Sequence, residues 1–222
     1  MSHAGERVAS AYDQWSRTYE VVENATRDLA ARTLRQYPLQ LRDRTILEIG
    51  CGTGLNTGYL AQHAKELIAF DFSAGMLEQA RAKITAGNVR FVQCDIQLEW
   101  PLDKESVDLV VCMLVLEHIA NLEHVFQEAS RVLRYGGEFF VCELHPYKQL
   151  QGLQAKFTDT NSGNLVLVQA FLHDVSDYVK ASIRHGFQVL RLDEWRDEKD
   201  EDKTKAPRLL SLHVDRRVEG SR

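Results

Sequence analysis

Three glycines at alternate positions, Gly50, Gly52 and Gly54, follow directly after the apolar run Thr45–Ile49. Because glycine has no Cβ atom, a ligand can approach its backbone closely and hydrogen-bond to its N–H groups. A glycine-rich loop between a strand and a helix places those groups at the helix N-terminus, at the carboxyl edge of a sheet, where ligands commonly bind. The sequence therefore predicts a ligand site at this loop.

The spacing of the glycines narrows the kind of site. A dinucleotide-binding loop has the pattern G-x-G-x-x-G, which requires glycine where this chain has Leu55. The pattern present is E-x-G-x-G-x-G, from Glu48 to Gly54. One such loop is weak evidence for a particular ligand, so the interpretation depends on the segments that follow it.

Short apolar runs and helical stretches alternate along most of the chain. The expected strands are Thr45–Ile49, Leu67–Phe70, Val89–Gln93, Val107–Leu114, Glu138–Glu143, Phe187–Trp195 and Arg208–Val214. The expected helices are Ser10–Tyr37, in two stretches, Leu55–Lys65, Ala74–Ala86, Leu122–Leu133 and Val175–His185. This alternation is typical of an α/β protein with a parallel sheet and helices on both faces. The continuous apolar character of the strands fits a sheet that is covered on both sides.

Four segments, in order, resemble the class I methyltransferases that use S-adenosylmethionine. They are LEIGCGTGLN (residues 47–56), FDFSAGMLEQA (70–80), FVQCDI (91–96) and the stretch from Val107 to Glu143. The resemblance covers about Tyr12–Glu143 and is weaker afterwards. Four ordered matches at suitable spacing are much stronger evidence than one glycine loop.

The resemblance implies a fold, an activity and a cofactor. The fold is a Rossmann-like three-layer sandwich, with a mostly parallel seven-stranded sheet whose last strand is antiparallel. The activity is transfer of a methyl group from S-adenosylmethionine to a small-molecule acceptor, which leaves S-adenosylhomocysteine. Such a displacement requires no metal.

The resemblance also assigns roles at the loop and at the strand ends. The Asp71 carboxylate is expected to accept hydrogen bonds from both ribose hydroxyls, and Asp95 from the adenine amino group. Both acids alternatively fit helix caps or surface loops, and Met76 alternatively fits the core. The cofactor-binding residues that the resemblance implies are Tyr12, Tyr19, Glu48, Gly50, Cys51, Gly52, Gly54, Asn56, Asp71, Phe72, Met76, Asp95, Ile96, Cys112, Met113 and Leu114.

Two segments outside the strand–helix alternation are expected to cover the site of a single methyltransferase domain, residues 1–222. Residues 1–44 contain Tyr12, Trp15 and Tyr19 on one helix face; this is either core packing, which we favour for Trp15, or a lid over the cofactor, as in similar enzymes. Residues 146–173 contain a predicted hairpin turn at 161–164. We expect this insertion to cap the acceptor and to determine its identity.

Two histidines are candidates for catalysis. Alignment of the reactants can supply up to ~7–11 kcal/mol, and a general base helps where the nucleophile carries a proton. Glu117 and His118 follow the fourth expected strand, and His118 is the better base because an imidazole titrates near neutral pH. The alternative is a helix-start histidine bonded to backbone. His145, at the end of the fifth strand, is the second candidate.

Composition excludes some partners. The formal net charge is −5 and the pI is about 5.9, whereas nucleic-acid binders usually show a basic patch or a high pI. Basic residues recur from Arg27 to Arg44, where we expect a solvated helix face. No apolar run reaches the ~18–20 residues that span a bilayer, and the N-terminus lacks the apolar core of a signal peptide. The four cysteines form no CxxC pair, so a cytoplasmic protein with reduced thiols is expected.

Two other functional classes remain as alternatives to a small-molecule methyltransferase. One is a methyltransferase of protein or tRNA, and the other is a non-catalytic S-adenosylmethionine-binding protein. The acidic balance counts against tRNA, and the intact loop with Asp71 and Asp95 counts against a non-catalytic protein. The sequence fits a monomer or a homodimer equally.

Overall fold

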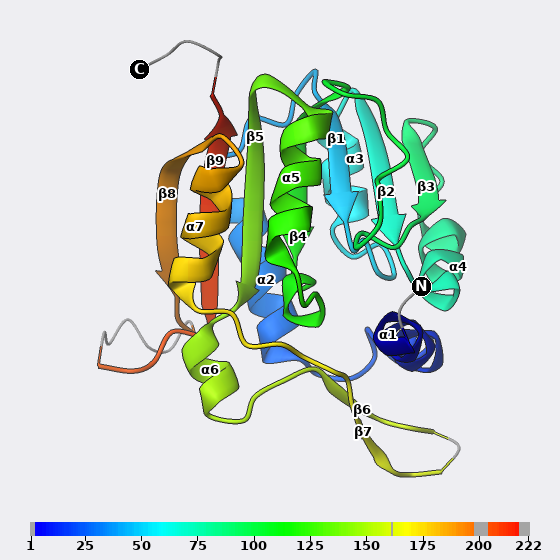
Figure 1. The fold of residues 1–222 in the computed structure, drawn as a ribbon. Helices are drawn as coiled ribbons and strands as arrows, with labels where there is room; N and C mark the ends of the chain where they lie inside the picture. The colour runs from blue at the N-terminus through cyan, green and yellow to red at the C-terminus, as the bar shows by residue number, and fades with distance from the viewer. Residues whose placement is uncertain (1–2, 161, 198–203, 218–222) are drawn as a thin grey trace.

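The computed structural model describes residues 3–160, 162–197 and 204–217. Within these residues seven strands form one sheet, in the order β3-β2-β1-β4-β5-β9-β8 (Figure 1). The strands are β1 Thr45–Ile49, β2 Glu66–Asp71, β3 Val89–Gln93, β4 Val107–Met113, β5 Leu133–Leu144, β8 Phe187–Trp195 and β9 Leu209–Arg216. β9 pairs antiparallel with both β5 and β8, so it alone runs against the other strands. The predicted sheet, with its last strand antiparallel, is confirmed.

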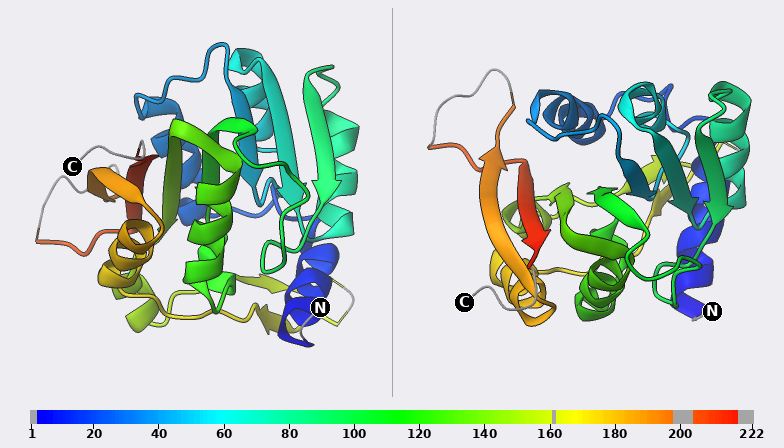
Figure 2. Two further views of the ribbon diagram at one scale, coloured as in Figure 1. Left: turned by 45° about the horizontal axis from the view of Figure 1, so that its top comes forward. Right: turned by 90° about the horizontal axis from the view of Figure 1, so that it is seen from above.

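Helices cover both faces of the sheet. They are α1 His3–Trp15, α2 Ala25–Gln36, α3 Thr57–His63, α4 Ala74–Lys83, α5 Leu122–Val132, α6 Pro146–Leu150 and α7 Val175–Arg184, with a single 3-10 turn, η1, at Leu116–His118. Figure 2 shows α2, α3 and α4 over one face and α5 and α7 over the other. The three-layer sandwich that the resemblance implied is therefore present.

Alternating side chains of the central strands supply two cores. In β2, Ile68 and Phe70 point to the core that contains α5, while Leu67 points to the core that contains α2 and α3. This two-residue alternation follows from strand geometry, in which successive side chains lie on opposite faces. Because both faces are filled, the ends of the strands are held at fixed positions.

The largest differences from the predicted elements lie at the N-terminus and in the insertion. The stretch Ser10–Tyr37 is two helices separated at residues 16–24, and the side chain of Asn24 caps α2 by accepting from the Arg27 N–H at 3.0 Å. Residues 146–150 form the short helix α6, which the sequence did not indicate. The predicted hairpin is confirmed as β6 Lys156–Thr158 paired antiparallel with β7 Leu165–Leu167; position 161 of its turn lies outside the described residues.

One end of the sheet is covered by these two segments. In Figure 1, α1 and the β6–β7 hairpin lie beyond the carboxyl ends of the central strands. The rings of Trp15 and Phe157 are stacked, with centroids 5.2 Å apart and an interplanar angle of 15°, so α1 packs directly on the hairpin. In the part of the chain that the structure describes, no helix is both long enough and apolar enough to cross a membrane.

Candidate active site

A cavity lies at the carboxyl ends of β1, β2 and β4, beneath α1. Its empty volume is about 760 Å³, counting the mouth that is open to solvent. The predicted cofactor residues that line it are Tyr12, Tyr19, Gly50, Gly52, Asp71, Phe72, Met76, Asp95, Ile96, Met113 and Leu114. The fold thus brings most of the predicted set to one cavity, which we call the cofactor cavity.

The three glycines of the loop all have positive φ angles, and each meets a different environment. Gly50 has φ +67°, and a Cβ there would lie 2.1 Å from Cγ2 of Val115. Gly54 packs against Ala80 of α4 and lies outside the cavity lining. A Cβ at Gly52 would meet no protein atom within 4 Å, and Gly52 lines the cavity. The bare backbone at Gly52 is therefore the part of the loop that a ligand can reach.

Asp71 fixes the loop to the start of α4. One carboxylate oxygen accepts from the Gly52 N–H at 2.8 Å, and the other accepts from the Ser73 N–H at 2.9 Å. Burial raises the pKa of Asp71 to about 6, although these N–H bonds act in the opposite direction. Each carboxylate oxygen keeps a further lone pair, so Asp71 can also accept hydrogen bonds from a ligand in the cavity.

The segment after β3 forms another wall of the cofactor cavity. Asp95 accepts from the Gln97 N–H at 3.0 Å, and the adjacent Ile96 side chain is buried. The indole N–H of Trp100 donates to the Ile96 carbonyl at 3.0 Å, which fixes the turn. A carboxylate next to an apolar side chain can bind the amino edge of a flat heterocycle and pack against its face.

Two predicted cofactor residues are buried behind the cavity instead of lining it. The Glu48 carboxylate accepts from the Thr57 hydroxyl at 2.7 Å, which ties β1 to α3 beneath the glycine loop. Burial raises the pKa of Glu48 to about 8. Cys112 is fully buried in β4, with its Sγ 3.8 Å from the Glu143 carboxylate. These residues support the loop and the strand from behind.

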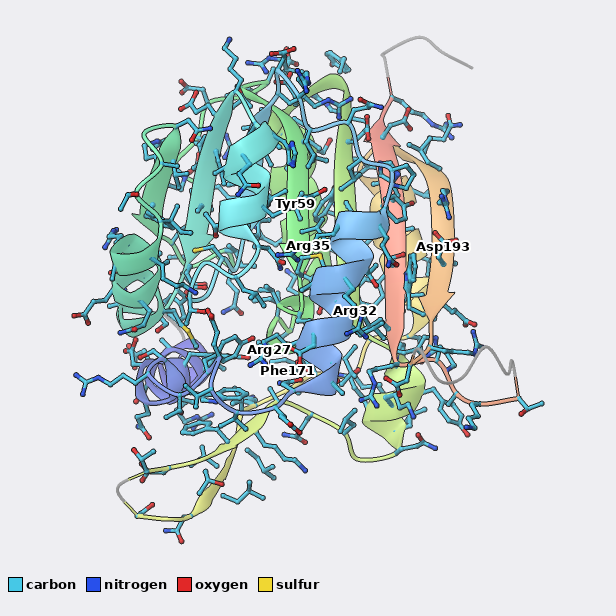
Figure 3. The ribbon with its side chains drawn as sticks, turned by 180° about the vertical axis from the view of Figure 1, so that it is seen from behind. Arg27, Arg32, Arg35, Tyr59, Phe171 and Asp193 are labelled. Atoms are coloured by element: carbon cyan, nitrogen blue, oxygen red, sulfur yellow. The ribbon has the colours of Figure 1, made fainter. Side chains whose placement is uncertain are left out.

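A smaller cavity adjoins the cofactor cavity at Gly50 and Gly52. Its lining includes the two remaining predicted residues, Cys51 and Asn56, together with Arg27 of α2. Figure 3 labels Arg27 at the end of α2 that lies toward α1. The Arg27 guanidinium donates to the Tyr19 carbonyl and to Asp28, and it is only 8% exposed. The prediction of a solvated face is therefore wrong for Arg27. A buried guanidinium beside the loop is suited to a carboxylate ligand.

His118 lines the cofactor cavity, as a catalytic base would, and it is also bonded to backbone, as the alternative interpretation expected. Its Nδ1 lies 2.6 Å from the Gln169 carbonyl, which can only accept, so Nδ1 carries the hydrogen. Its Nε2 then has a free lone pair and accepts from the Tyr12 hydroxyl at 2.8 Å. Burial lowers the pKa of His118 and raises that of Tyr12. The ring is accordingly neutral, with its lone pair directed at Tyr12.

His145 is not brought to the cofactor cavity. Its Nδ1 accepts from the Tyr147 N–H at 3.1 Å and so caps α6, while its Nε2 faces Glu194 at 3.3 Å. Pro146 begins the helix directly after it. Nδ1 thus serves the start of α6 and Nε2 faces Glu194 of β8, so the geometry lends no support to the prediction that His145 is catalytic.

Two buried glutamates at this edge of the sheet, Glu143 and Glu117, were not predicted as site residues. Glu143, 1% exposed, accepts from the Val115 N–H at 3.0 Å and so holds the turn after β4. Glu117 is 6% exposed, and its Oε1 lies 3.7 Å from His118 Nε2. Burial raises the pKa of Glu117 to about 7, with Gln149 acting against this shift. An acid inside the apolar run FFVCE was the available signal for Glu143.

Comparisons with known proteins agree with the fold and the motifs. Residues 47–141 match the family described as a methyltransferase domain. The biotin biosynthesis bifunctional protein BioHC of Cellvibrio japonicus is 34% identical over 141 residues, which are 64% of this chain and 28% of that protein. The malonyl-[acyl-carrier protein] O-methyltransferase of Methylovorus sp. is 28% identical over 84% of this chain and 65% of its own length. The chain therefore spans less than two thirds of either relative.

Solved structures share the fold at lower identity. The DhpI–SAH complex has a TM-score of 0.74 at 20% identity, covering 98% of this chain and 99% of that one. An S-adenosylmethionine-dependent methyltransferase from Mesorhizobium loti has a TM-score of 0.71 at 20% identity, covering 85% and 99%. The ordered motifs, the sheet topology and the family match agree: residues 47–141 belong to the methyltransferase-domain family, and the chain has the fold of S-adenosylmethionine-dependent methyltransferases.

Proposed function

We propose that this chain binds S-adenosylmethionine in the cofactor cavity and catalyses methyl transfer to a small-molecule acceptor. The observation that carries the proposal is the arrangement of Gly52 and Asp71, a bare backbone and a half-buried carboxylate that line the same cavity. When bound, S-adenosylmethionine supplies a methyl group already activated by its sulfonium. The protein has to bind it, align the acceptor with it and exclude water.

The residues present fit the parts of this cofactor. Asp71 has spare lone pairs for ribose hydroxyls, and Asp95 with Ile96 offers an acceptor and an apolar face for adenine. Arg27, in the smaller cavity beside the loop, matches the charge of the methionine carboxylate. Tyr12 and Tyr19 present aromatic faces to the cofactor cavity, which suits a cation.

Residues 1–44 act in this proposal as a lid. The Asp13 carboxylate of α1 accepts from the Ser73 hydroxyl at 2.6 Å and from the Gly75 N–H at 2.8 Å, both at the start of α4. This clasp holds α1 over the cavity and so limits access of water. Residues 146–173 act as the cap on the acceptor side, because their hairpin packs against the same helix.

A small molecule is the favoured acceptor for two reasons. The net charge of −5 disfavours a polyanion such as tRNA. Among the relatives, a demethylmenaquinone methyltransferase of Clavibacter sepedonicus and a ubiquinone biosynthesis O-methyltransferase of Serratia proteamaculans are 32% and 28% identical over matched segments. Their names concern those proteins, but they support the acceptor class proposed for this one.

Calorimetric titration with S-adenosylmethionine, S-adenosylhomocysteine and NAD tests the cofactor. We expect binding of the first two and none of NAD. Asp71→Asn should weaken S-adenosylhomocysteine binding by about 10- to 100-fold, since hydrogen bonds to charged groups contribute ~1.5–3 kcal/mol. Asp108→Asn is the matched control, because Asp108 also accepts a backbone N–H, that of Thr45 at 2.8 Å, but at the opposite end of the sheet. Equal affinities for wild type and Asp71→Asn would contradict the proposed site.

A further inference from the structure

A further cavity, distinct from the smaller one that contains Arg27, adjoins the cofactor cavity at Tyr12 and Tyr19. Tyr12, Tyr19 and Leu114 line both cavities, so the two meet at these side chains. This further cavity, which we call the outer cavity, extends from Glu117 to the β6–β7 hairpin, where Phe157 belongs to its lining. Its empty volume is about 1080 Å³, counting its open mouth. A ligand in the outer cavity would thus lie beside one in the cofactor cavity.

The inner end of the outer cavity contains polar atoms that lack partners. The Gln149 side chain lies close enough to the Glu117 carboxyl group to lower its pKa, but Glu117 Oε2 is buried and makes no hydrogen bond to the described residues. The indole N–H of Trp15 is likewise buried without a partner among these residues. Glu117 and Trp15 both line the cavity. A buried carboxylate oxygen without a donor is destabilising, because it has lost its hydrogen bonds to water and gained none in the protein. A ligand that donates a hydrogen bond to Glu117 would remove that cost.

One wall of the outer cavity is aromatic, and the rest of the lining includes charged residues such as Lys156 and Arg208. Trp15 stacks on Phe157 and also on Tyr12, with the second pair of ring centroids 5.7 Å apart at an angle of 19°. Tyr19 meets the Trp15 ring edge-on at a centroid distance of 4.9 Å. Aromatic walls favour a ligand with a planar apolar body, because rings gain most from stacked or edge-to-face contacts.

Glu117 is also close to groups that face the cofactor cavity. Its Oε1 lies 3.7 Å from His118 Nε2, and that nitrogen accepts from the Tyr12 hydroxyl. Burial raises the pKa of Glu117 to about 7, so the carboxyl can exchange a proton near neutral pH. The junction of the two cavities thus holds a carboxylate with spare accepting capacity, adjacent to a neutral imidazole.

We propose that the outer cavity binds the methyl acceptor, a planar apolar molecule with a hydroxyl or amine group, and that Glu117 accepts the proton from that group. The proposal rests on the proposed methyltransferase function. The O–H or N–H bond of the acceptor breaks and its proton passes to the Glu117 carboxylate. The electron pair on oxygen or nitrogen forms the bond to the methyl carbon, and the carbon–sulfur pair remains on sulfur as S-adenosylhomocysteine.

The test measures binding of three probes to the full chain saturated with S-adenosylhomocysteine. The probes are β-naphthol, β-naphthylamine and methyl β-naphthyl ether, which share a planar body, but the ether has no donor. We expect both donor probes to bind at least tenfold more tightly than the ether. The tighter of the two donor probes identifies oxygen or nitrogen as the favoured acceptor atom. Equal affinity for all three probes would overturn the proposal without any variant.

Variants then assign the donor preference to one side chain. In Glu117→Ala the preference for donor probes should fall to within about twofold, while S-adenosylhomocysteine affinity stays unchanged. Glu117→Leu, which approximately preserves size and cannot accept a hydrogen bond, provides the same readout if the alanine variant does not fold. Glu123→Gln on α5 is the control, because its carboxylate pairs with Arg184 and His185 on the surface. A preference that persists in both Glu117 variants refutes this inference alone, whereas loss of S-adenosylhomocysteine binding in wild type refutes the proposed function itself.

Discussion

The glycine loop allows one sharp test, because Gly52 is the position where a methyl group would enter the space assigned to the cofactor. Gly52 has φ +54°, and a Cβ built there meets no protein atom within 4 Å. The Gly52→Ala change therefore causes no clash within the protein. It has two effects: alanine is strained in this backbone conformation, and its methyl group lies where a ligand would contact the loop.

The two effects differ in size and in the property that they change. A non-glycine residue in the left-handed region costs about 1–2 kcal/mol of folding free energy. For a chain of this length, each kcal/mol lowers the melting temperature by about 2–4 °C. If the cofactor lies against this backbone, the added methyl should also weaken S-adenosylhomocysteine binding at least tenfold, which corresponds to about 1.4 kcal/mol.

Gly136→Ala is the matched control. Gly136 has φ +73°, its Cβ would also meet nothing within 4 Å, and it lies in β5 toward the amino end of that strand, away from the cavity. Thermal unfolding and calorimetric titration of both variants separate stability from binding. We expect similar losses of stability and a loss of affinity only in Gly52→Ala. Unchanged affinity in Gly52→Ala, or an equal loss in Gly136→Ala, would refute the assignment of this loop to the cofactor.

Three further predictions concern buried acids and the lid. The folded-state pKa of Glu48, about 8, is above its ordinary value of 4.5. The stability that its neutral form supports is therefore lost as pH rises from about 4.5 to 8. In chemical denaturation between pH 5 and pH 8, Glu48→Gln should lose less stability than wild type, and equal losses in the two proteins would contradict this. Once an acceptor is identified, methyl transfer should increase with pH through about 7 as Glu117 ionises, while His118, whose pKa burial lowers, stays neutral; a pH–rate profile that is unchanged in Glu117→Gln would exclude this role. Asp13→Ala removes the clasp on α4 and should accelerate S-adenosylhomocysteine release several-fold in stopped-flow measurements; equal release rates in Asp13→Ala and in the surface variant Gln14→Ala would show that the clasp does not hold the lid.

The features that sequence predicted well depend on local signals. The apolar run before Gly50 marks a buried strand, and Asp71 and Asp95 follow the two strands after it, so parallel pairing alone places both acids at one edge. Each of these inferences needs only a few consecutive residues and the general behaviour of parallel sheets. The cofactor cavity was therefore predictable in outline.

The features that sequence missed depend on contacts between distant segments. His118 and His145 both follow strands, but only the structure shows that Pro146 begins a helix capped by His145, whereas the Gln169 carbonyl from the insertion orients His118. Arg27 looks like one of several surface cations, and its burial depends on where Tyr19 lies. Side-chain pairing across more than one hundred residues, such as that of Tyr12 with His118, leaves no periodic signal in the sequence.

The stack of Trp15 on Phe157 has a consequence for the order of events in a catalytic cycle. The same short stretch of α1 carries Trp15 against the hairpin and Tyr12 between the two cavities, so one wall serves both ligands. Ordering of that wall by either ligand reduces the entropy cost for the other, and such coupling of binding free energies is reciprocal. An acceptor that binds before the spent cofactor leaves would then trap it, so turnover should show substrate inhibition at high acceptor concentration.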